Sequence, residues 1–94
     1  MLASRPDDID IRTLIAVIAK QRGDVAGAVE QYTWLMRHTA DSVQMRYNRA
    51  EALFEGGAYQ QAREDIDTLL AVQPDHPLVR QLSAKVEEKL RSVP

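Results

Sequence analysis

The chain carries at residues 47–62 the sequence YNRAEALFEGGAYQQA, in which a Gly-Gly pair separates two helix-forming segments. Moved back by 34 residues, this stretch lies without a gap over residues 13–28. The coinciding positions are Ala50 with Ala16, Gly57 with Gly23 and Ala62 with Ala28, and the same step forward brings Ala50 onto Ala84. A 34-residue period is typical of a solenoid built from helix-turn-helix units. The sequence therefore predicts an all-α helical repeat.

The composition is typical of a soluble folded domain. The 94 residues are 45% hydrophobic and 28% charged, with a net charge of −2 and no Cys. The lack of Cys excludes disulfides, thiol catalysis and Cys-ligated zinc, and the net charge gives no general attraction to nucleic acid. No apolar run approaches the ~18 residues of a membrane span, and residues 1–8 lack the apolar middle of a signal peptide. We expect a soluble protein without membrane insertion, cytoplasmic or, with a targeting segment outside this chain, periplasmic.

Start and stop signals divide the chain into five helices. We predict helices over residues 8–22, 25–38, 42–55, 59–72 and 75–91. The residues expected to cap helix starts are Asp7 or Asp8, Asp24, Asp41 and Asp75. The expected turn and stop residues are Gly23, Gly56, Gly57 and Pro74, with Pro77 in the first turn of the last helix.

Apolar residues spaced three and four apart mark the side of each helix that faces the core. From the second helix to the fifth, the expected inward residues are Ala28, Val29, Tyr32, Leu35 and Met36; Val43, Tyr47, Ala50, Leu53 and Phe54; Ala62, Ile66, Leu69 and Leu70; and Leu78, Val79, Leu82, Val86 and Leu90. Ala28 is small because two helices of a hairpin cross closely there. The fifth helix has a charged opposite face, so we interpret it as a cap that meets solvent.

The first helix is apolar around most of its circumference, which favours cover on more than one side. We expect a self-association face made of Ile9, Ile11, Leu14 and Ile18. A second copy of the chain, forming a homodimer, is one way to cover this face. An earlier repeat outside this chain, a partner protein, or tight packing within the chain would cover it equally well.

The chain resembles the tetratricopeptide repeat proteins over residues 7–91. The small residues of the family pattern are kept by Ala16, Ala50 and Ala84 in the first helices and by Ala28 and Ala62 in the second helices. The turn glycines Gly23 and Gly57 and the closing Pro74 match as well. The bulky places depart from the pattern, because Arg12, Arg46 and Arg80 replace its opening aromatic and Arg49 and Ser83 replace a large apolar residue.

This resemblance implies a single domain over residues 1–94, a right-handed α-solenoid of antiparallel helix hairpins. Repeat one is expected at about 7–40, repeat two at about 41–74 and the capping helix at about 75–91. Members of the family generally bind peptides or partner proteins in a concave groove lined by the first helix of each unit, without catalysis or cofactors. By the same resemblance, the groove residues here are Asp10, Thr13, Val17, Lys20 and Gln21 from the first unit and Gln44, Tyr47, Asn48, Glu51 and Phe54 from the second.

Two hypotheses for function therefore stand side by side. The first is a protein-interaction module whose mixed groove, with Lys20 against Asp10, Glu51 and Glu55, suits a peptide with apolar anchors and basic residues. The second is a self-association or scaffold unit of a larger repeat-containing assembly. Tyr47 and Phe54 are candidate aromatic anchors or, alternatively, packing residues. Trp34 is either part of a second contact surface or partly buried.

Other sites have weaker signals. Asn48 lies where some members of the family hold a terminal carboxylate, but the matching places carry apolar residues or Thr13, so we reject that clamp. His38 and His76 are far apart and lack ligand partners one turn away, which argues against a metal site. Glu64, Asp65 and Asp67 are interpreted as a solvated helix face rather than as a catalytic pair. Gly56-Gly57 lacks the Lys and Ser or Thr of a phosphate loop, and the arginines are interleaved with acids, against a nucleic-acid patch.

Overall fold

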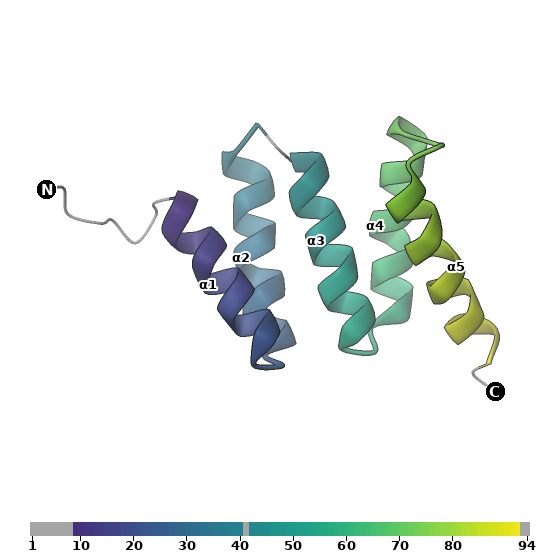
Figure 1. Ribbon diagram of the computed structural model, residues 1–94, viewed down its shortest axis with the longest axis horizontal. Coiled ribbons are helices and arrows are strands. Elements are labelled where there is room, and N and C mark those ends of the chain that lie inside the picture. Colours follow the sequence, from purple (N-terminus) through teal and green to yellow (C-terminus); the bar gives the residue numbers. More distant parts are fainter. Residues whose placement is uncertain (1–8, 41, 93–94) are drawn as a thin grey trace, which may run out of the picture.

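The computed structural model describes residues 9–40 and 42–92, and five helices account for most of them (Figure 1). They are α1 (Ile9–Gln21), α2 (Val25–His38), α3 (Ser42–Glu55), α4 (Tyr59–Val72) and α5 (Pro77–Arg91). No strand occurs among the described residues. The predicted all-α helical repeat is confirmed. The expected caps Asp7, Asp8 and Asp41 lie outside the described residues.

The helices stand side by side in chain order, and each packs against the next (Figure 1). In this view α2 and α4 lie behind α1, α3 and α5. The first helices of the units therefore form one layer and the second helices the other. This alternation places the same face of α1 and α3 on the same side of the molecule.

Both hairpin turns have the same geometry, 34 residues apart. Gly23 and Gly57 adopt φ of +79° and +84°, the left-handed region that glycine tolerates at little cost. The amide of Asp24 donates to the Ala19 carbonyl at 2.8 Å, and the amide of Ala58 donates to the Leu53 carbonyl at 2.8 Å. The sequence repeat is thus a repeat of backbone hydrogen bonds as well.

The helix caps follow the prediction in α2 but not in α5. Asp24 caps α2, because its Oδ1 accepts from the Gly27 amide at 3.0 Å. The prediction that Asp75 caps α5 is wrong. Pro77 is at the first helical position, so the preceding residue, His76, is extended and its Nδ1 accepts from the Val79 amide at 3.4 Å. Asp75 lies one residue too early to reach that amide.

The core consists of two clusters, both of which Val29 contacts. One joins α1 and α2 with Ala52 of α3 and contains Ala16, Ala19, Ala28, Tyr32, Leu35 and Ala52. The other joins α3, α4 and α5 and contains Ala50, Leu53, Ala62, Ile66, Leu69, Val79, Leu82 and Val86. Ala52 was not expected in the core. Leu78, expected to be buried, is 52% exposed because it lies in the first turn of α5, at the edge of the packed stripe.

Candidate functional site

A hollow of about 470 Å³ lies between α1 and α3, and we call it the α1–α3 hollow. It is lined by Val17, Lys20 and Gln21 of α1, Tyr32 of α2, and Asn48 and Glu55 of α3. These side chains converge because α1 and α3 are equivalent first helices of successive units. It contains four residues of the predicted groove, Val17, Lys20, Gln21 and Asn48.

Lys20 crosses this hollow and pairs with two carboxylates of α3. Its Nζ donates to Glu51 Oε1 at 2.5 Å and lies 3.9 Å from Glu55 Oε2. Burial lowers the pKa of Lys20, but the hydrogen bond and charge of Glu51, with Glu55 behind it, outweigh that effect and raise it. One ammonium thus faces two carboxylates, which leaves the α3 side of the hollow acidic.

Tyr32 forms part of the hollow from α2, although the sequence predicted only a core role for it. The residue is buried in the first core cluster, and it also lines the α1–α3 hollow. Burial raises the pKa of the Tyr32 phenol, Lys20 lowers it, and Glu51 and Glu55 raise it further. The sequence signal was its place four residues after Ala28, which turns it toward the neighbouring first helices.

The other predicted groove residues use their side chains within the protein. The Thr13 hydroxyl donates to the Ile9 carbonyl at 2.8 Å, and Gln44 Nε2 donates to Asn48 Oδ1 at 3.0 Å. Asp10 is exposed and precedes Val17 by seven residues, about two helical turns, so it does not line the α1–α3 hollow. Asn48 is the residue of this group that lines it.

The two candidate anchors, Tyr47 and Phe54, do not line the α1–α3 hollow. Both are half-buried against the second core cluster. The Tyr47 ring lies 6.5 Å from the His76 ring at 20°, and the Phe54 ring lies 5.5 Å from the Tyr59 ring at 53°. Burial raises the pKa of Tyr47. These contacts favour the packing role that the sequence left open.

A buried ion-pair network between α3 and α4 was missed by the sequence reading. Asp65 is 3% exposed, and the prediction of a solvated face is wrong for this residue. Arg49 binds it with two nitrogens, Nε to Oδ2 at 2.8 Å and Nη2 to Oδ1 at 2.5 Å, and Arg46 Nη1 adds a bond at 3.0 Å. The hydrogen bond to Asp65 raises the pKa of Arg49. The sequence did contain one signal of this network. Arg49 stands at a place where the family has a large apolar residue.

Trp34 is half-buried rather than fully exposed, and its ring contacts two side chains. The Arg12 guanidinium lies 4.2 Å from one ring centroid, and the His38 ring stacks at 3.9 Å and 8°. Arg12 also donates to Gln31 Oε1 at 3.1 Å. The alternative of partial burial is therefore the one that the geometry favours.

The face that we expected to self-associate is largely open. Leu14 is 59% exposed, Ile9 and Ile18 are exposed as well, and Ile11 is half-buried. Ile15, which was not in that set, is also exposed. Large apolar side chains are therefore grouped on one helix, where the described part of the chain does not cover them.

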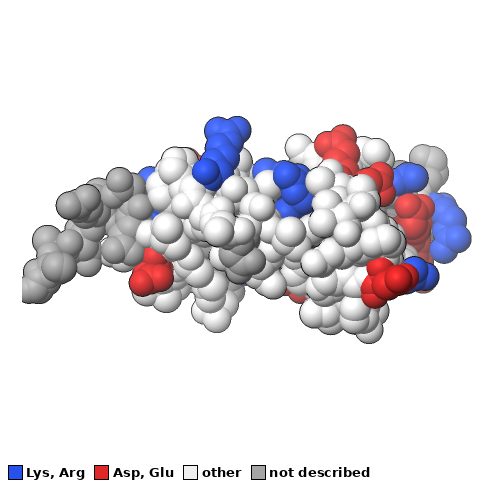
Figure 2. All heavy atoms as spheres, turned by 90° about the horizontal axis from the view of Figure 1, so that it is seen from above, with Lys and Arg blue, Asp and Glu red and all other residues white. Residues whose placement is uncertain are grey.

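Charged residues are distributed unevenly over the face that is seen from above. Seen from above, Lys, Arg, Asp and Glu gather at the end where α5 lies, and the middle shows mostly uncharged surface (Figure 2). In residues 9–40 and 42–92, no three His, Asp or Glu side chains are grouped as metal ligands. None of the helices in that part of the chain is long and apolar enough to cross a membrane.

Comparison with known proteins gives one match. The family model described as Tetratricopeptide repeat matches residues 19–86, which is most of the chain and spans the end of α1 through most of α5. No curated protein and no solved structure matches.

Proposed function

The chain belongs to the tetratricopeptide repeat family, whose domains are in general protein-interaction modules, and from that premise we propose that it binds a peptide in the α1–α3 hollow without catalysing a reaction. The peptide is extended or helical and carries basic residues beside apolar ones.

The pairing of Lys20 with two glutamates carries this proposal. Lys20 Nζ lies 2.5 Å from Glu51 Oε1 and 3.9 Å from Glu55 Oε2, and the Glu55 side chain is the more exposed of the two carboxylates. A basic side chain of a peptide can therefore join Glu55 without breaking the Lys20–Glu51 bond. Charge-assisted hydrogen bonds of this kind are stronger than neutral ones.

Apolar contacts come from the other wall of the hollow. Val17 is exposed there and supplies the apolar surface, whereas Tyr32 also lines the hollow but is 3% exposed and held by the core. Asn48 also lines the hollow; its Oδ1 already accepts from Gln44, but a side-chain amide has two acceptor and two donor places, which leaves capacity for a peptide backbone. Because these groups are fixed by the three packed helices α1, α2 and α3, binding costs little ordering of the protein itself.

Selection of phage-displayed random peptides on the purified protein tests this function. We expect selected peptides to combine Lys or Arg with large apolar residues. Glu55→Lys and Asn48→Ala are each expected to weaken binding of the selected peptide, the charge reversal by about tenfold or more. Glu88→Lys, an exposed reversal on α5, is the matched control and should leave affinity unchanged.

Circular dichroism shows whether each variant keeps its helices before binding is compared. Selected peptides without basic residues, or equal binding by the wild type and Glu55→Lys, would contradict the proposal. Tyr47→Ala is a poorer test, because Tyr47 packs against the core and its loss would mix folding with binding.

A second candidate function, self-association through α1, has its own observation. Leu14, Ile15 and Ile18 are exposed side by side on one helix, and burial of apolar surface contributes roughly 25 cal/mol per Å². Light scattering across a dilution series tests it, with Leu14→Lys as the variant. Val72→Lys is the matched control, since Val72 is 64% exposed on a different helix.

A shift toward twice 10.6 kDa at high concentration, abolished by Leu14→Lys and not by Val72→Lys, would support self-association. A monomer at every concentration would exclude this function and leave the α1–α3 hollow as the surface to pursue.

A further inference from the structure

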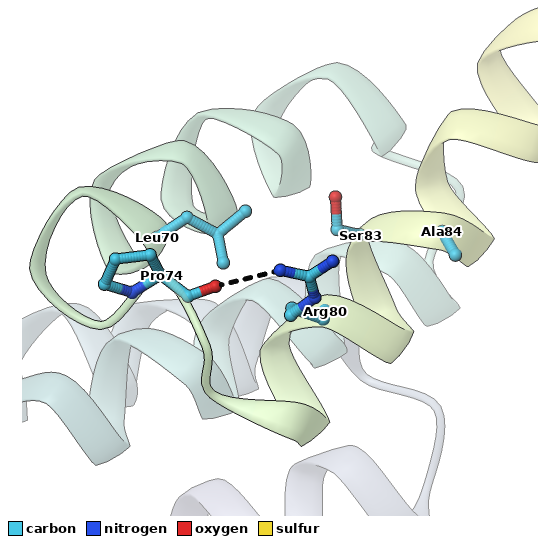
Figure 3. Close-up of a pocket in the computed structure, with 5 residues that line it drawn as sticks. All are labelled: Leu70, Pro74, Arg80, Ser83 and Ala84. Carbon is cyan, nitrogen blue, oxygen red and sulfur yellow. Dashed lines mark hydrogen bonds between the residues drawn. The ribbon is translucent and has the colours of Figure 1, made fainter.

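A second hollow, of about 440 Å³, lies between α4 and α5, and we call it the α5 surface. It is lined by Leu70, Pro74, Arg80, Ser83 and Ala84. In Figure 3 the Arg80 side chain reaches toward the Pro74 carbonyl, with Leu70 beside it. The α5 surface shares no residue with the α1–α3 hollow.

The same face is covered by another helix in both preceding units. Ala16 and Ala50 occupy the place of Ala84 at 34-residue intervals, and both are fully buried. Ala16 belongs to one core cluster with Ala28 of α2, and Ala50 belongs to the other with Ala62 of α4. Ala84, by contrast, is exposed. A residue kept small for a close helix crossing is therefore open on α5.

The arginine of this face shows the same contrast. Arg12 donates to Gln31 at 3.1 Å, and Arg46 donates to Asp65 at 3.0 Å, in both cases across the interface to the following helix. Arg80 holds the equivalent place on α5, where its contacts are with the chain just before the helix. These are the Pro74 carbonyl at 3.4 Å and the exposed Asp75 carboxylate at 3.8 Å.

The two covered units also define what the covering helix must carry. Relative to its small residue, the acceptor for the arginine is three positions later and a large side chain is four positions later. The two examples are Ala28, Gln31 and Tyr32 in α2, and Ala62, Asp65 and Ile66 in α4. Both helices run antiparallel to the arginine-bearing helix (Figure 1).

The C-terminal half of α5 further restricts the sequence of a helix that could cover it. Glu87 stands where Leu53 is buried in the preceding unit, and it pairs with Arg63 at 3.3 Å. A covering helix with a large apolar residue at that level would bury Glu87. The complementary helix therefore has a polar or basic first turn, and its apolar residues follow the acidic one.

We propose that the α5 surface binds an amphipathic helix of a partner protein, antiparallel to α5. This helix carries Ala or Gly opposite Ala84, a carboxylate three residues later that binds Arg80, and an apolar residue directly after the carboxylate. The geometry is the one that the chain itself uses between α3 and α4.

A fluorescein-labelled peptide with the sequence of residues 58–73 and the change Tyr59→Lys is the probe, because it combines the α4 pattern with the basic first turn that Glu87 requires. Fluorescence anisotropy is expected to show saturable binding to the full chain. Ala84→Trp, which fills the crossing point, should weaken binding by about tenfold or more. Ala26→Trp places the same side chain at an exposed position on α2 and should leave affinity unchanged.

A charge exchange tests the contact with Arg80. Arg80→Glu should weaken binding of this peptide, and the same peptide with Asp65→Arg should recover the loss on Arg80→Glu while binding the wild-type chain poorly. Arg22→Glu, at another exposed arginine, is the matched control. Glu55→Lys in the α1–α3 hollow should not affect this peptide, which separates the test from that of the proposed function.

No saturable binding up to millimolar peptide would overturn the proposal. So would equal affinity for Ala84→Trp and wild type, because the peptide would then occupy another place, such as that of the chain's own α4. A dimer that Ala84→Trp abolishes would assign the α5 surface to a second copy of the chain. That result would likewise overturn the proposal of a partner helix.

Discussion

Arg46 donates a hydrogen bond to Asp65 across the α3–α4 interface, with Nη1 and Oδ1 3.0 Å apart. The equivalent bond 34 residues earlier joins Arg12 to Gln31 at 3.1 Å. One geometry is thus used twice, with a carboxylate in the second unit and an amide in the first. The carboxylate also holds Arg49, which in turn donates to the Thr33 hydroxyl of α2 at 3.1 Å. Asp65 therefore ties three helices together.

Removing this carboxylate should destabilise the fold strongly. Asp65→Ala leaves two partly buried guanidinium groups without their partner, and breaking a buried pair costs about 3–5 kcal/mol. Asp65→Gln keeps an acceptor of the type that Gln31 supplies to Arg12, so we expect a smaller loss. Urea unfolding measures the free energy of unfolding, and the exposed Asp67→Ala is the control. A loss from Asp65→Ala no larger than that of the control would contradict the network.

Ala50 and Ala84, which hold equivalent places in successive units, should differ in their tolerance of a larger side chain. Ala50→Leu places three more carbons at a fully buried crossing and is expected to cost about 1–3 kcal/mol. Ala84→Leu makes the same change at the equivalent exposed place, where an effect below about 0.5 kcal/mol is expected. Thermal unfolding of the two variants compares them directly. Equal destabilisation would show that Ala84 is covered in solution.

The turn at Gly57 needs a left-handed backbone rather than space. Its φ is +84°, and an added Cβ would meet no atom within 4 Å. Gly57→Ala should therefore cost about 1–2 kcal/mol through the backbone alone, and Gly57→Asn less, because Asn tolerates this region. Chemical denaturation measures both. If Ala and Asn prove equally harmless, backbone strain does not control this turn.

Stability should fall at alkaline pH. The folded state raises the pKa of Tyr32, Tyr47 and Lys20, so each binds its proton more tightly when folded. Their contribution is complete below the unfolded values of about 10 and is lost as pH rises through the higher folded values. Urea unfolding between pH 8 and 11 should show this decline, and Tyr32→Phe should reduce it. A free energy that does not change with pH over this range would contradict the assignment.

The sequence alone was sufficient for the architecture. The 34-residue register of Ala16, Ala50, Gly23 and Gly57 predicts hairpins whose turns and crossings the structure confirms, because small residues and left-handed glycines are local requirements. The family followed from the same residues. The bounds of α2, α3 and α4 were likewise predicted from caps and turn residues.

The side-chain partners could not be predicted in the same way. The sequence predicts a solvated Asp65 because Glu64 and Asp67 beside it are charged and exposed. Its burial is favourable only because Arg46 and Arg49 of α3 pair with its carboxylate. Tyr47 and Phe54 were expected to line the groove together with Asn48, but their rings turn toward His76 and Tyr59 of the following elements.

Local chemistry thus determined where the helices begin, turn and cross. The tertiary structure decided which charges are buried, which groove residues meet in the α1–α3 hollow, and that Ala84 is open where Ala16 and Ala50 are covered. The physical reason is that a helix's sequence specifies its faces, whereas the energy of a polar or apolar face depends on the element that packs against it.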